Sequence, residues 1–224
     1  MKLLFLGTGA ADWSREVQDD PEYRRFSSTL IDDVLLIDPG PHVINALKTF
    51  NCDEKKIKYV INTHRHSDHY NKDTLEFLEK SGAEFIDFKA GDKKQVGDYL
   101  IEAYEGNHGK IETVHFFISD GTKTLFYGLD SSWLMPHEAG RIISKGVDYA
   151  ILDGTLGDVL GDIRIIEHCD LGMIREIVLS LKKHVGRFCI NHYAKQYFPT
   201  RAITDEFGRK YGVDTTYDGL EIEI

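Results

Sequence analysis

Short apolar runs alternate with amphipathic segments along the chain, a pattern typical of a protein that mixes strands with helices. Runs rich in β-branched and aromatic residues predict strands at 3–6, 28–31, 34–37, 58–61, 84–88, 99–104, 115–119, 124–129, 149–152, 187–190 and 221–224. Apolar residues at helical spacing predict helices at 43–50, 74–80, 136–144, 171–183 and 201–211. Asp73 and Asp170 are expected to cap the second and fourth of these helices. The strands fall into two groups with helices interspersed, which predicts two packed sheets with helices outside.

Residues 10–27 break this pattern, with mixed charges and little periodicity, and are expected to form a long loop of the kind that often borders a functional site. The apolar start at 1–6 is too short for a signal peptide and is interpreted as the first strand. No apolar run approaches membrane-spanning length. No repeat or linker interrupts the 224 residues, so we expect a single domain spanning 1–224.

Charge narrows the classes of partner. Lys and Arg total 27 against 37 Asp and Glu, a formal net charge of −10. A broadly acidic surface repels a polyanion, so long nucleic acid is not expected as a partner. A small anionic substrate is compatible with this charge, because a metal ion can reverse the electrostatic potential locally. The three cysteines, Cys52, Cys169 and Cys189, form no CxxC pair, which favours idle thiols in a reducing cytoplasm.

The sequence THRHSDHY at 63–70 places three histidines and an aspartate within six positions, directly after a predicted strand. Imidazole nitrogens and carboxylate oxygens suit Zn²⁺, Mn²⁺ or Fe²⁺. Alternate residues of an extended segment point to one side, so His64 and His66 are expected to share one ion. A turn at Ser67 then lets Asp68 and His69 face a second ion.

INTHRHSDH at 61–69 resembles the signature of the metallo-β-lactamase superfamily, and FLGTGAAD and LLIDPG ahead of it extend the likeness. The resemblance implies an αββα four-layer sandwich of mixed α/β class, which agrees with the elements predicted above. It also implies two divalent ions, with zinc the first expectation. The ligands implied for one ion are His64, His66 and His108, those for the other are Asp68, His69 and His192, and Asp130 is the bridge.

The third ligand of the first ion has two candidates. His108 lies in a glycine-flanked loop, whereas His115 opens a predicted strand, so the pattern favours His108 and leaves His115 as the alternative. An aspartate at position 130, in LFYGLDSS, favours the hydrolase and phosphodiesterase branches of the superfamily over true β-lactamases.

Two neighbouring ions lower the pKa of a shared water towards neutrality, which would supply a bridging hydroxide as the nucleophile. The segment IEHCDLGMIREIVLSL resembles the phosphodiesterase branch, which includes ribonuclease Z and the cyclic phosphodiesterases of phosphonate breakdown. The histidine at this place, His168, is implied to protonate the leaving oxygen. Asp68 and His168 are therefore the predicted catalytic residues, acting on a small cyclic or nucleotide-like phosphodiester.

Other residues have supporting roles in this prediction. Asp38, in LLIDPG, matches an aspartate that braces the metal-binding loops. Arg25 (or its neighbour Arg24), Ser28 and Tyr193 are candidates for substrate contacts, although charged pairs and aromatic residues more often serve the surface and the core.

The chain lacks the glycine-rich arm with which ribonuclease Z grips tRNA and the cysteine cluster of many phosphonate-pathway members. These departures leave the predicted metal-dependent hydrolysis unchanged, but they do not identify the substrate. The alternatives are a thioester or lactone hydrolase with the same ligands, and a non-catalytic metal-binding protein. The sequence leaves the oligomeric state open, with a homodimer as one arrangement.

Overall fold

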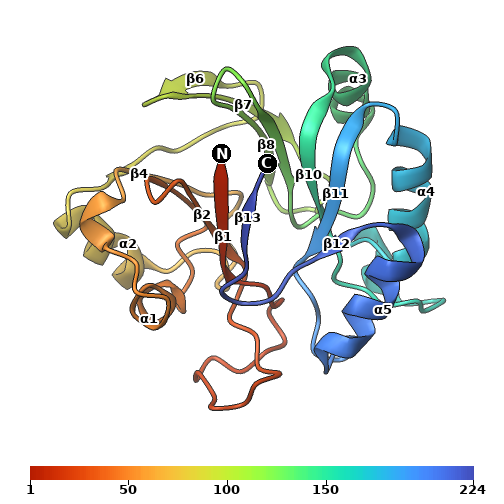
Figure 1. Cartoon of the computed structure of the whole chain (residues 1–224), viewed down its shortest axis with the longest axis horizontal. Helices are drawn as coiled ribbons and strands as arrows, with labels where there is room; N and C mark the ends of the chain where they lie inside the picture. The colour runs from red at the N-terminus through yellow and green to blue at the C-terminus, as the bar shows by residue number, and fades with distance from the viewer. The chain divides into compact units, whose positions relative to one another are not determined.

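The computed structural model describes all 224 residues, and contacts divide them into two compact units, Met1–Phe88 with Thr216–Ile224, and Lys89–Thr215. The first unit contains a six-stranded sheet of order β13-β1-β2-β3-β4-β5. Its strands are β1 (Lys2–Gly7), β2 (Ser28–Ile31), β3 (Leu35–Ile37), β4 (Tyr59–Ile61), β5 (Glu84–Phe85) and β13 (Glu221–Glu223). Both termini belong to this unit, where β1 pairs antiparallel with β13 (Figure 1).

The strands β2 and β3 form a hairpin across Asp32 and Asp33, whose φ angles are 49° and 61°. Positive φ at both central residues is the condition for a type I′ turn, and aspartate tolerates this conformation better than most side chains. The next two connections are parallel, β3 with β4 and β4 with β5. The carboxyl ends of β3 and β4 therefore lie at the same edge of the sheet.

Two helices, α1 (Val43–Thr49) and α2 (Lys72–Lys80), and a short 3-10 helix at Glu54–Lys56 complete the regular structure of the first unit. Apolar side chains of both helices share a buried cluster with residues of β1 to β4. The predicted cap of the second helix was wrong: Asn71, not Asp73, accepts the hydrogen bond from the Thr74 amide, and Asp73 lies in the first turn. Residues 8–27 form the predicted long connection, anchored by the buried side chains of Trp13, Tyr23 and Phe26.

The second unit contains a seven-stranded sheet of order β12-β11-β10-β9-β8-β7-β6. Its strands are β6 (Lys93–Val96), β7 (Tyr99–Glu105), β8 (Val114–Ser119), β9 (Thr124–Gly128), β10 (Val147–Asp153), β11 (Val185–Asn191) and β12 (Asp214–Thr215). Pairing is antiparallel from β6 to β9 and parallel from β9 to β12. The parallel strands end at one edge, and ligand sites of open α/β sheets lie beyond such carboxyl ends.

Three helices, α3 (Pro136–Lys145), α4 (Leu171–Leu181) and α5 (Arg201–Tyr211), and a 3-10 helix at Ile163–Ile166 belong to this unit. Their apolar faces share one buried cluster with the sheet. Asp170 caps α4 as predicted, accepting from the Met173 amide at 2.7 Å. The mixed α/β class with two sheets is confirmed, while the single domain stays a prediction. No helix has the length and apolar character needed to cross a membrane.

Candidate metal centre

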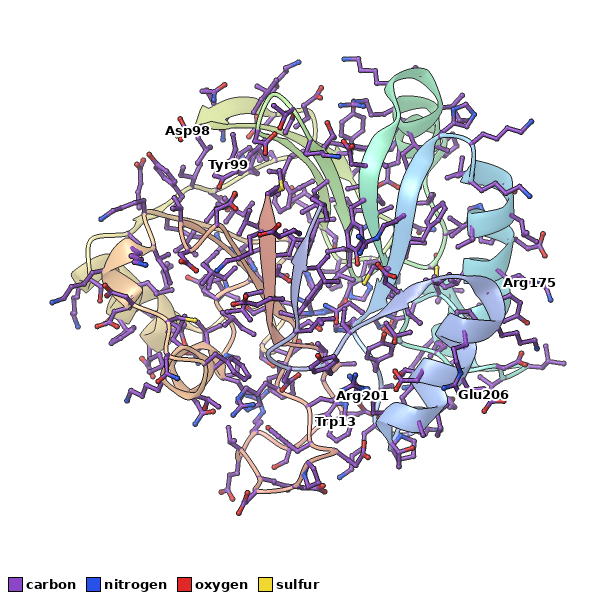
Figure 2. The ribbon with its side chains drawn as sticks, in the orientation of Figure 1. Trp13, Asp98, Tyr99, Arg175, Arg201 and Glu206 are labelled. Atoms are coloured by element: carbon purple, nitrogen blue, oxygen red, sulfur yellow. The ribbon has the colours of Figure 1, made fainter.

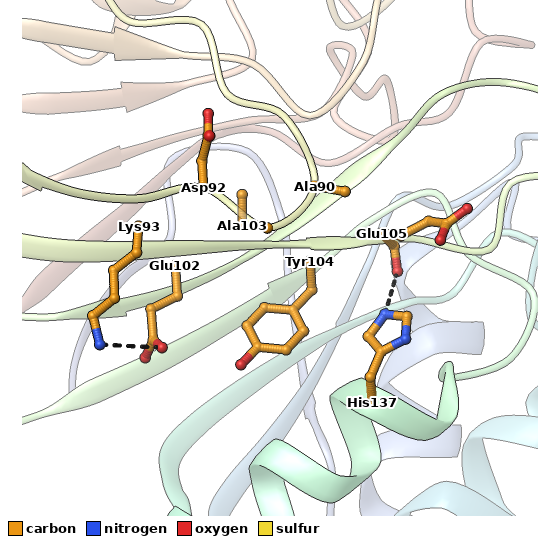
Figure 3. A pocket seen from close by; sticks show the side chains of 9 residues that line it. Ala90, Asp92, Lys93, Glu102, Ala103, Tyr104, Glu105 and His137 are labelled. Carbon is orange, nitrogen blue, oxygen red and sulfur yellow. Dashed lines mark hydrogen bonds and ion pairs between the residues drawn. The ribbon is translucent and has the colours of Figure 1, made fainter.

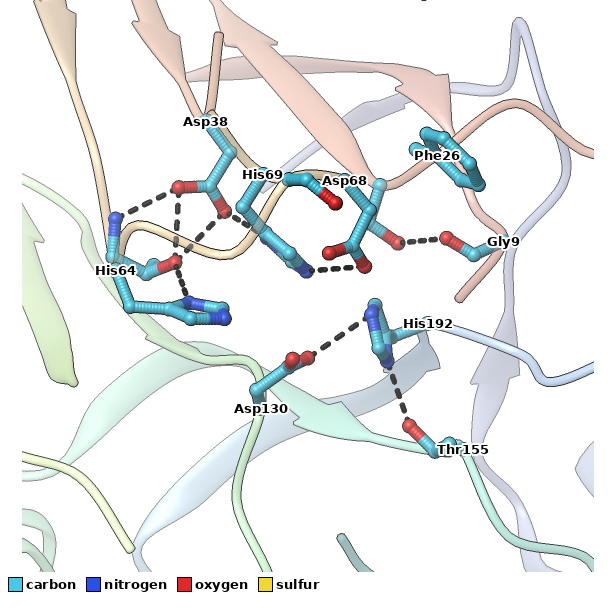
Figure 4. A network of polar contacts seen from close by, with 12 residues as sticks. Gly9, Phe26, Asp38, His64, Asp68, His69, Asp130, Thr155 and His192 are labelled. Atoms are coloured by element: carbon cyan, nitrogen blue, oxygen red, sulfur yellow. Dashed lines mark hydrogen bonds and ion pairs between the residues drawn. The ribbon is translucent and has the colours of Figure 1, made fainter. Parts of the chain in front are cut away.

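In the first unit, a buried carboxylate organises the segment that carries the histidine motif. Asp38 follows β3 directly, is fully buried and has a φ of 63°. Its carboxylate accepts from the Thr63 amide at 2.7 Å, the Thr63 hydroxyl at 2.9 Å and the Asn62 side chain at 2.9 Å (Figure 4). Since β3 and β4 are parallel and end in register at Ile37 and Ile61, Asp38 lies beside the residues that follow β4.

The same carboxylate orients a histidine of the motif. His69 Nδ1 donates to Asp38 Oδ2 at 2.9 Å, and His69 Nε2 lies 3.4 Å from Asp68 Oδ2. The His64 ring lies 4.6 Å from the His66 ring and 4.5 Å from the His69 ring, centroid to centroid. Gly40 makes this packing feasible, because a Cβ there would lie 2.2 Å from the Asp68 carbonyl oxygen. The structure thus gathers all four side chains of the motif.

In the second unit, three neighbouring parallel strands each end in a polar residue at the same edge. Asp130 lies two residues beyond β9, Asp153 ends β10, and His192 follows β11. Asp153 and Asn191 are direct register partners, which places His192 next to the end of β10. The φ angles of Asp130 and His192 are 30° and 68°, a strained backbone of the kind concentrated at functional sites.

Two predicted ligands meet the carboxylate of Asp130. His192 Nε2 lies 3.1 Å from Asp130 Oδ1, and His108 Nε2 lies 3.5 Å from Asp130 Oδ2. On its other side, His192 Nδ1 is hydrogen-bonded to the Thr155 hydroxyl at 2.7 Å (Figure 4). His108 Nδ1 donates to the Glu167 carbonyl at 2.9 Å. Burial lowers the pKa of His108, and Asp130 only partly opposes this effect, so the neutral imidazole is favoured.

Four histidines, two in each unit, share one hydrogen-bonding pattern, in which Nδ1 lies within hydrogen-bonding distance of an oxygen of a supporting group. The pairs are His64 with the Thr63 hydroxyl, His69 with Asp38, His108 with the Glu167 carbonyl and His192 with the Thr155 hydroxyl. A carbonyl or carboxylate can only accept, so in His69 and His108 Nδ1 carries the proton and Nε2 presents its lone pair. This arrangement is the usual support of metal-binding histidines.

Within the second unit, His168 is held by Asp153, a residue that the sequence analysis did not single out. His168 Nδ1 donates to Asp153 Oδ2 at 2.8 Å, and its ring stacks on His192 at 5.6 Å. Burial alone would lower the pKa of His168, but the charge and hydrogen bond of Asp153 outweigh it and raise this pKa to about 9. The ligand atoms of Asp130, Asp153, His168 and His192 all lie within 4.8 Å of one another. The sequence did contain a signal for Asp153. It stands at the end of an apolar run in LDG at 152–154, as Asp38 does in LID at 36–38.

The two candidates for the third ligand occupy different environments. His108 faces Asp130 through Nε2, whereas His115 lies inside β8 with its Nδ1 2.5 Å from Glu138 Oε1. Burial lowers the pKa of His115, but Glu138 more than compensates and raises it. These contacts favour His108 as the ligand.

The residues predicted to touch substrate are held by structural contacts. Arg25 donates to Asn45 at 2.8 Å and pairs with Asp218 at 3.4 Å. The Ser28 hydroxyl donates to the Ile37 carbonyl across the β2–β3 pair. Tyr193 is fully buried, and its hydroxyl donates to the Ile190 carbonyl at 2.6 Å. These contacts favour structural roles for all three.

Two hollows of the second unit lie apart from these residues. One, of about 430 Å³, lies beside β7 and α3, where the His137 ring donates to the Glu105 carbonyl (Figure 3). The other, of about 190 Å³, lies between α4 and α5, flanked by Arg175 and Glu206 (Figure 2). Neither is lined by a predicted ligand, so neither is the candidate centre.

The comparisons with known proteins agree with the motif. The model of the metallo-beta-lactamase superfamily matches residues 27–71. No curated protein matches the chain.

Among solved structures, the metallo-beta-lactamase fold protein YhfI from Bacillus subtilis is 18% identical, with a TM-score of 0.78 and coverage of 100% of this chain and 99% of that one. A diphosphatase of the PhnP family is 19% identical, with a TM-score of 0.73 and coverage of 100% and 97%. The short form of human tRNase Z is 17% identical, with a TM-score of 0.72 and coverage of 100% and 99%. The resemblance to the metallo-β-lactamase superfamily is thus confirmed: the chain has that fold over its whole length and carries the superfamily's sequence pattern at residues 27–71.

Proposed function

We propose that this protein is a metal-dependent hydrolase that holds two divalent ions between seven side chains. The proposed ligands are His64, His66 and His108 for one ion, Asp68, His69 and His192 for the other, and Asp130 as the bridge.

The observation that carries this proposal is the approach of imidazole lone pairs to carboxylate oxygens. His108 Nε2 and His69 Nε2 lie 3.5 and 3.4 Å from the carboxylates of Asp130 and Asp68, while Nδ1 of each donates to an acceptor. A lone pair facing a buried carboxylate is repulsive unless a cation lies between them. The lowered pKa of His108 disfavours a second proton on its ring, so a proton is not expected to separate this lone pair from Asp130. A divalent metal therefore fits this donor set, and zinc, manganese and iron all accept such ligands.

The bound ions would supply Lewis acidity and lower the pKa of water close to neutrality. The chain itself would supply the proton for the leaving group. His168 carries a raised pKa of about 9, so its ring is protonated at neutral pH, and Asp153 fixes the ring so that Nε2 points away from the supporting carboxylate. An alkoxide leaving group needs such an acid more than a thiolate does.

The substrate class that fits best is a small phosphodiester, and a protein with the same fold is described as a diphosphatase. Another protein with this fold is a tRNase, but the net charge of −10 disfavours a long polyanion as the substrate of this chain. A thioester or lactone hydrolase is the second candidate, because the same ligands would serve it. A non-catalytic metal-binding protein is the third.

Hydrolysis of a substrate panel by the metal-loaded chain tests this ranking. The panel pairs phosphodiesters that have p-nitrophenolate or alkoxide leaving groups with a thioester and a lactone. We expect turnover of the phosphodiesters and its loss on chelation. His168→Ala should slow the alkoxide ester more than the p-nitrophenyl ester, whereas the control His184→Ala, a half-buried histidine after α4, should slow neither. Turnover of the thioester or lactone alone would favour the second candidate, and bound metal without hydrolysis the third.

We also propose a cytoplasmic location, because Cys52, Cys169 and Cys189 form no disulfide and Cys169 and Cys189 are buried. A homodimer remains part of this proposal, and light scattering of the metal-loaded chain tests it.

A further inference from the structure

Within the second unit, a buried ion pair lies next to the segments that carry His108 and Asp130. His115 on β8 and Glu138 on α3 are both fully buried, and His115 Nδ1 donates to Glu138 Oε1 at 2.5 Å. The neighbours of His115 along β8, Phe116, Phe117 and Ile118, are apolar. Burying such a pair costs desolvation energy that two apolar side chains of the same size would avoid. Its presence in this core calls for a role that apolar residues could not fill.

On one side, the pair reaches the backbone of the proposed bridging ligand. His115 Nε2 lies 3.4 Å from the carbonyl oxygen of Asp130 and donates to it. The φ of Asp130 is 30°, a backbone conformation that a non-glycine residue keeps only when its surroundings hold it. The imidazole of His115 is one of the groups that holds it.

On the other side, the His115 ring sets the position of the loop that carries His108. A Cβ on Gly106 would lie 2.6 Å from His115 Nε2, so the backbone of this loop rests directly against the ring. The Gly106 amide donates to the Thr113 carbonyl, which closes the loop around His108. One side chain thus contacts both segments whose ligands meet at 3.5 Å.

Glu138 extends this support to the segment between Asp130 and α3. Its second oxygen, Oε2, accepts from the Met135 amide at 2.8 Å, a capping interaction at the start of α3. The chain from Asp130 to Met135 is therefore held at both ends by the one pair, through His115 at its start and through Glu138 at its end. Asn107 ties the two loops together, because its carbonyl accepts from the Ser132 amide at 2.9 Å.

We propose that His115 and Glu138 are positioning residues that hold the loops of His108 and Asp130 in the geometry needed to bind metal. The inference rests on the proposed function, because it assumes that these two residues are ligands. It assigns His115 a role distinct from that of a ligand, and it adds Glu138 to the residues on which the centre depends. Supporting residues of this kind commonly change metal affinity by about 10- to 100-fold.

The test is the Zn²⁺ affinity of variants, measured by competition with a chromophoric chelator, beside the thermal unfolding of each metal-free chain. His115→Leu fills the space without a donor, and we expect its affinity to fall by about tenfold or more. His115→Gln can place an amide N–H towards the Asp130 carbonyl and should recover most of the loss. Glu138→Gln keeps an acceptor for the Met135 amide and should lose less affinity than Glu138→Ala.

The matched control is Ile118→Ala, a fully buried residue of the same strand that contacts neither loop's backbone through a polar group. It should lower the unfolding temperature and leave Zn²⁺ affinity unchanged. Wild-type affinity in His115→Leu, or an equal loss in Ile118→Ala, would overturn this inference alone. Metal binding without hydrolysis would overturn only the proposed reaction, and a wild-type chain that binds no Zn²⁺ would overturn both.

Discussion

The imidazole of His168 donates from Nδ1 to the buried carboxylate of Asp153 at 2.8 Å, and that carboxylate also accepts from the Ser131 amide at 3.0 Å. Asp153 therefore links the proposed proton donor to the segment that follows Asp130. A histidine oriented by a carboxylate is a common acid–base device, because the second group fixes both the tautomer and the direction of the ring.

Asp153→Asn should move the alkaline limb of phosphodiester hydrolysis to lower pH. His168 acts as an acid only while protonated, so activity falls as pH rises through its pKa, which Asp153 raises to about 9. Removing the charge of Asp153 lowers the pKa of His168, so activity should begin to fall at a lower pH. The measurement is kcat/KM against pH for an ester with an alkoxide leaving group. Asp162→Asn, which removes a carboxylate paired with Arg164, is the control, and an unmoved limb in Asp153→Asn would contradict the role of His168.

Asp38→Asn should weaken both metal binding and the fold. The neutral amide cannot accept all the hydrogen bonds that Thr63, Asn62 and His69 donate to the buried carboxylate. We expect about 2 kcal/mol less free energy of unfolding in the metal-free chain. Zn²⁺ affinity should fall by about 10- to 100-fold.

Denaturant unfolding and metal titration measure the two effects. Asp87→Asn removes an exposed carboxylate that pairs with Arg65 in the same unit, and it should change neither quantity. Unchanged affinity in Asp38→Asn would show that His69 needs no such support.

Arg25→Ala should lower stability and leave KM unchanged. The guanidinium pairs with Asp218, whose side chain is 9% exposed, and donates to Asn45 and Thr49. Losing these contacts should cost about 1–3 kcal/mol. Denaturant unfolding and steady-state kinetics separate the two roles. A KM raised several-fold with an unchanged unfolding free energy would instead assign Arg25 to the substrate.

Metal removal should lower the unfolding temperature of the wild-type chain. Ions that bind only the folded state stabilise it by mass action, by about 2.7 kcal/mol at a free concentration one hundred times the Kd. For a chain of this size, that corresponds to a shift of about 5–10 °C. Calorimetry with and without a chelator measures the shift. Identical unfolding temperatures would be incompatible with a centre held by seven side chains.

Local signals in the sequence were sufficient for most elements. The strand at Ser28–Ile31 and the helix at Arg201–Tyr211 have the predicted bounds, because apolar periodicity and turn residues define both ends. The strands β6 and β12 were missed. β6 reads KKQV, without a β-branched or aromatic run, and forms only because β7 offers an antiparallel partner. β12 has two residues and depends on β11.

The site was predictable where its residues are adjacent in sequence and less so where the fold assembles them. The candidate donors at 64–69 are visible as a motif, and the resemblance to the superfamily pointed to Asp130 and His192 at the ends of predicted strands. Asp153 and Glu138 become informative only through their partners, His168 and His115, which lie 15 and 23 positions away. Arg25 looked like a substrate contact because its partner Asp218 is 193 positions distant.

The number of metal ions bound per chain tests the central claim most directly. Elemental analysis of the purified chain after loading with Zn²⁺ and removal of excess metal should give two ions per wild-type chain. Asp130→Ala, which removes the proposed bridge, should give one ion or fewer. A wild-type chain that retains no metal, or an Asp130→Ala chain that retains two ions, would contradict the proposed centre.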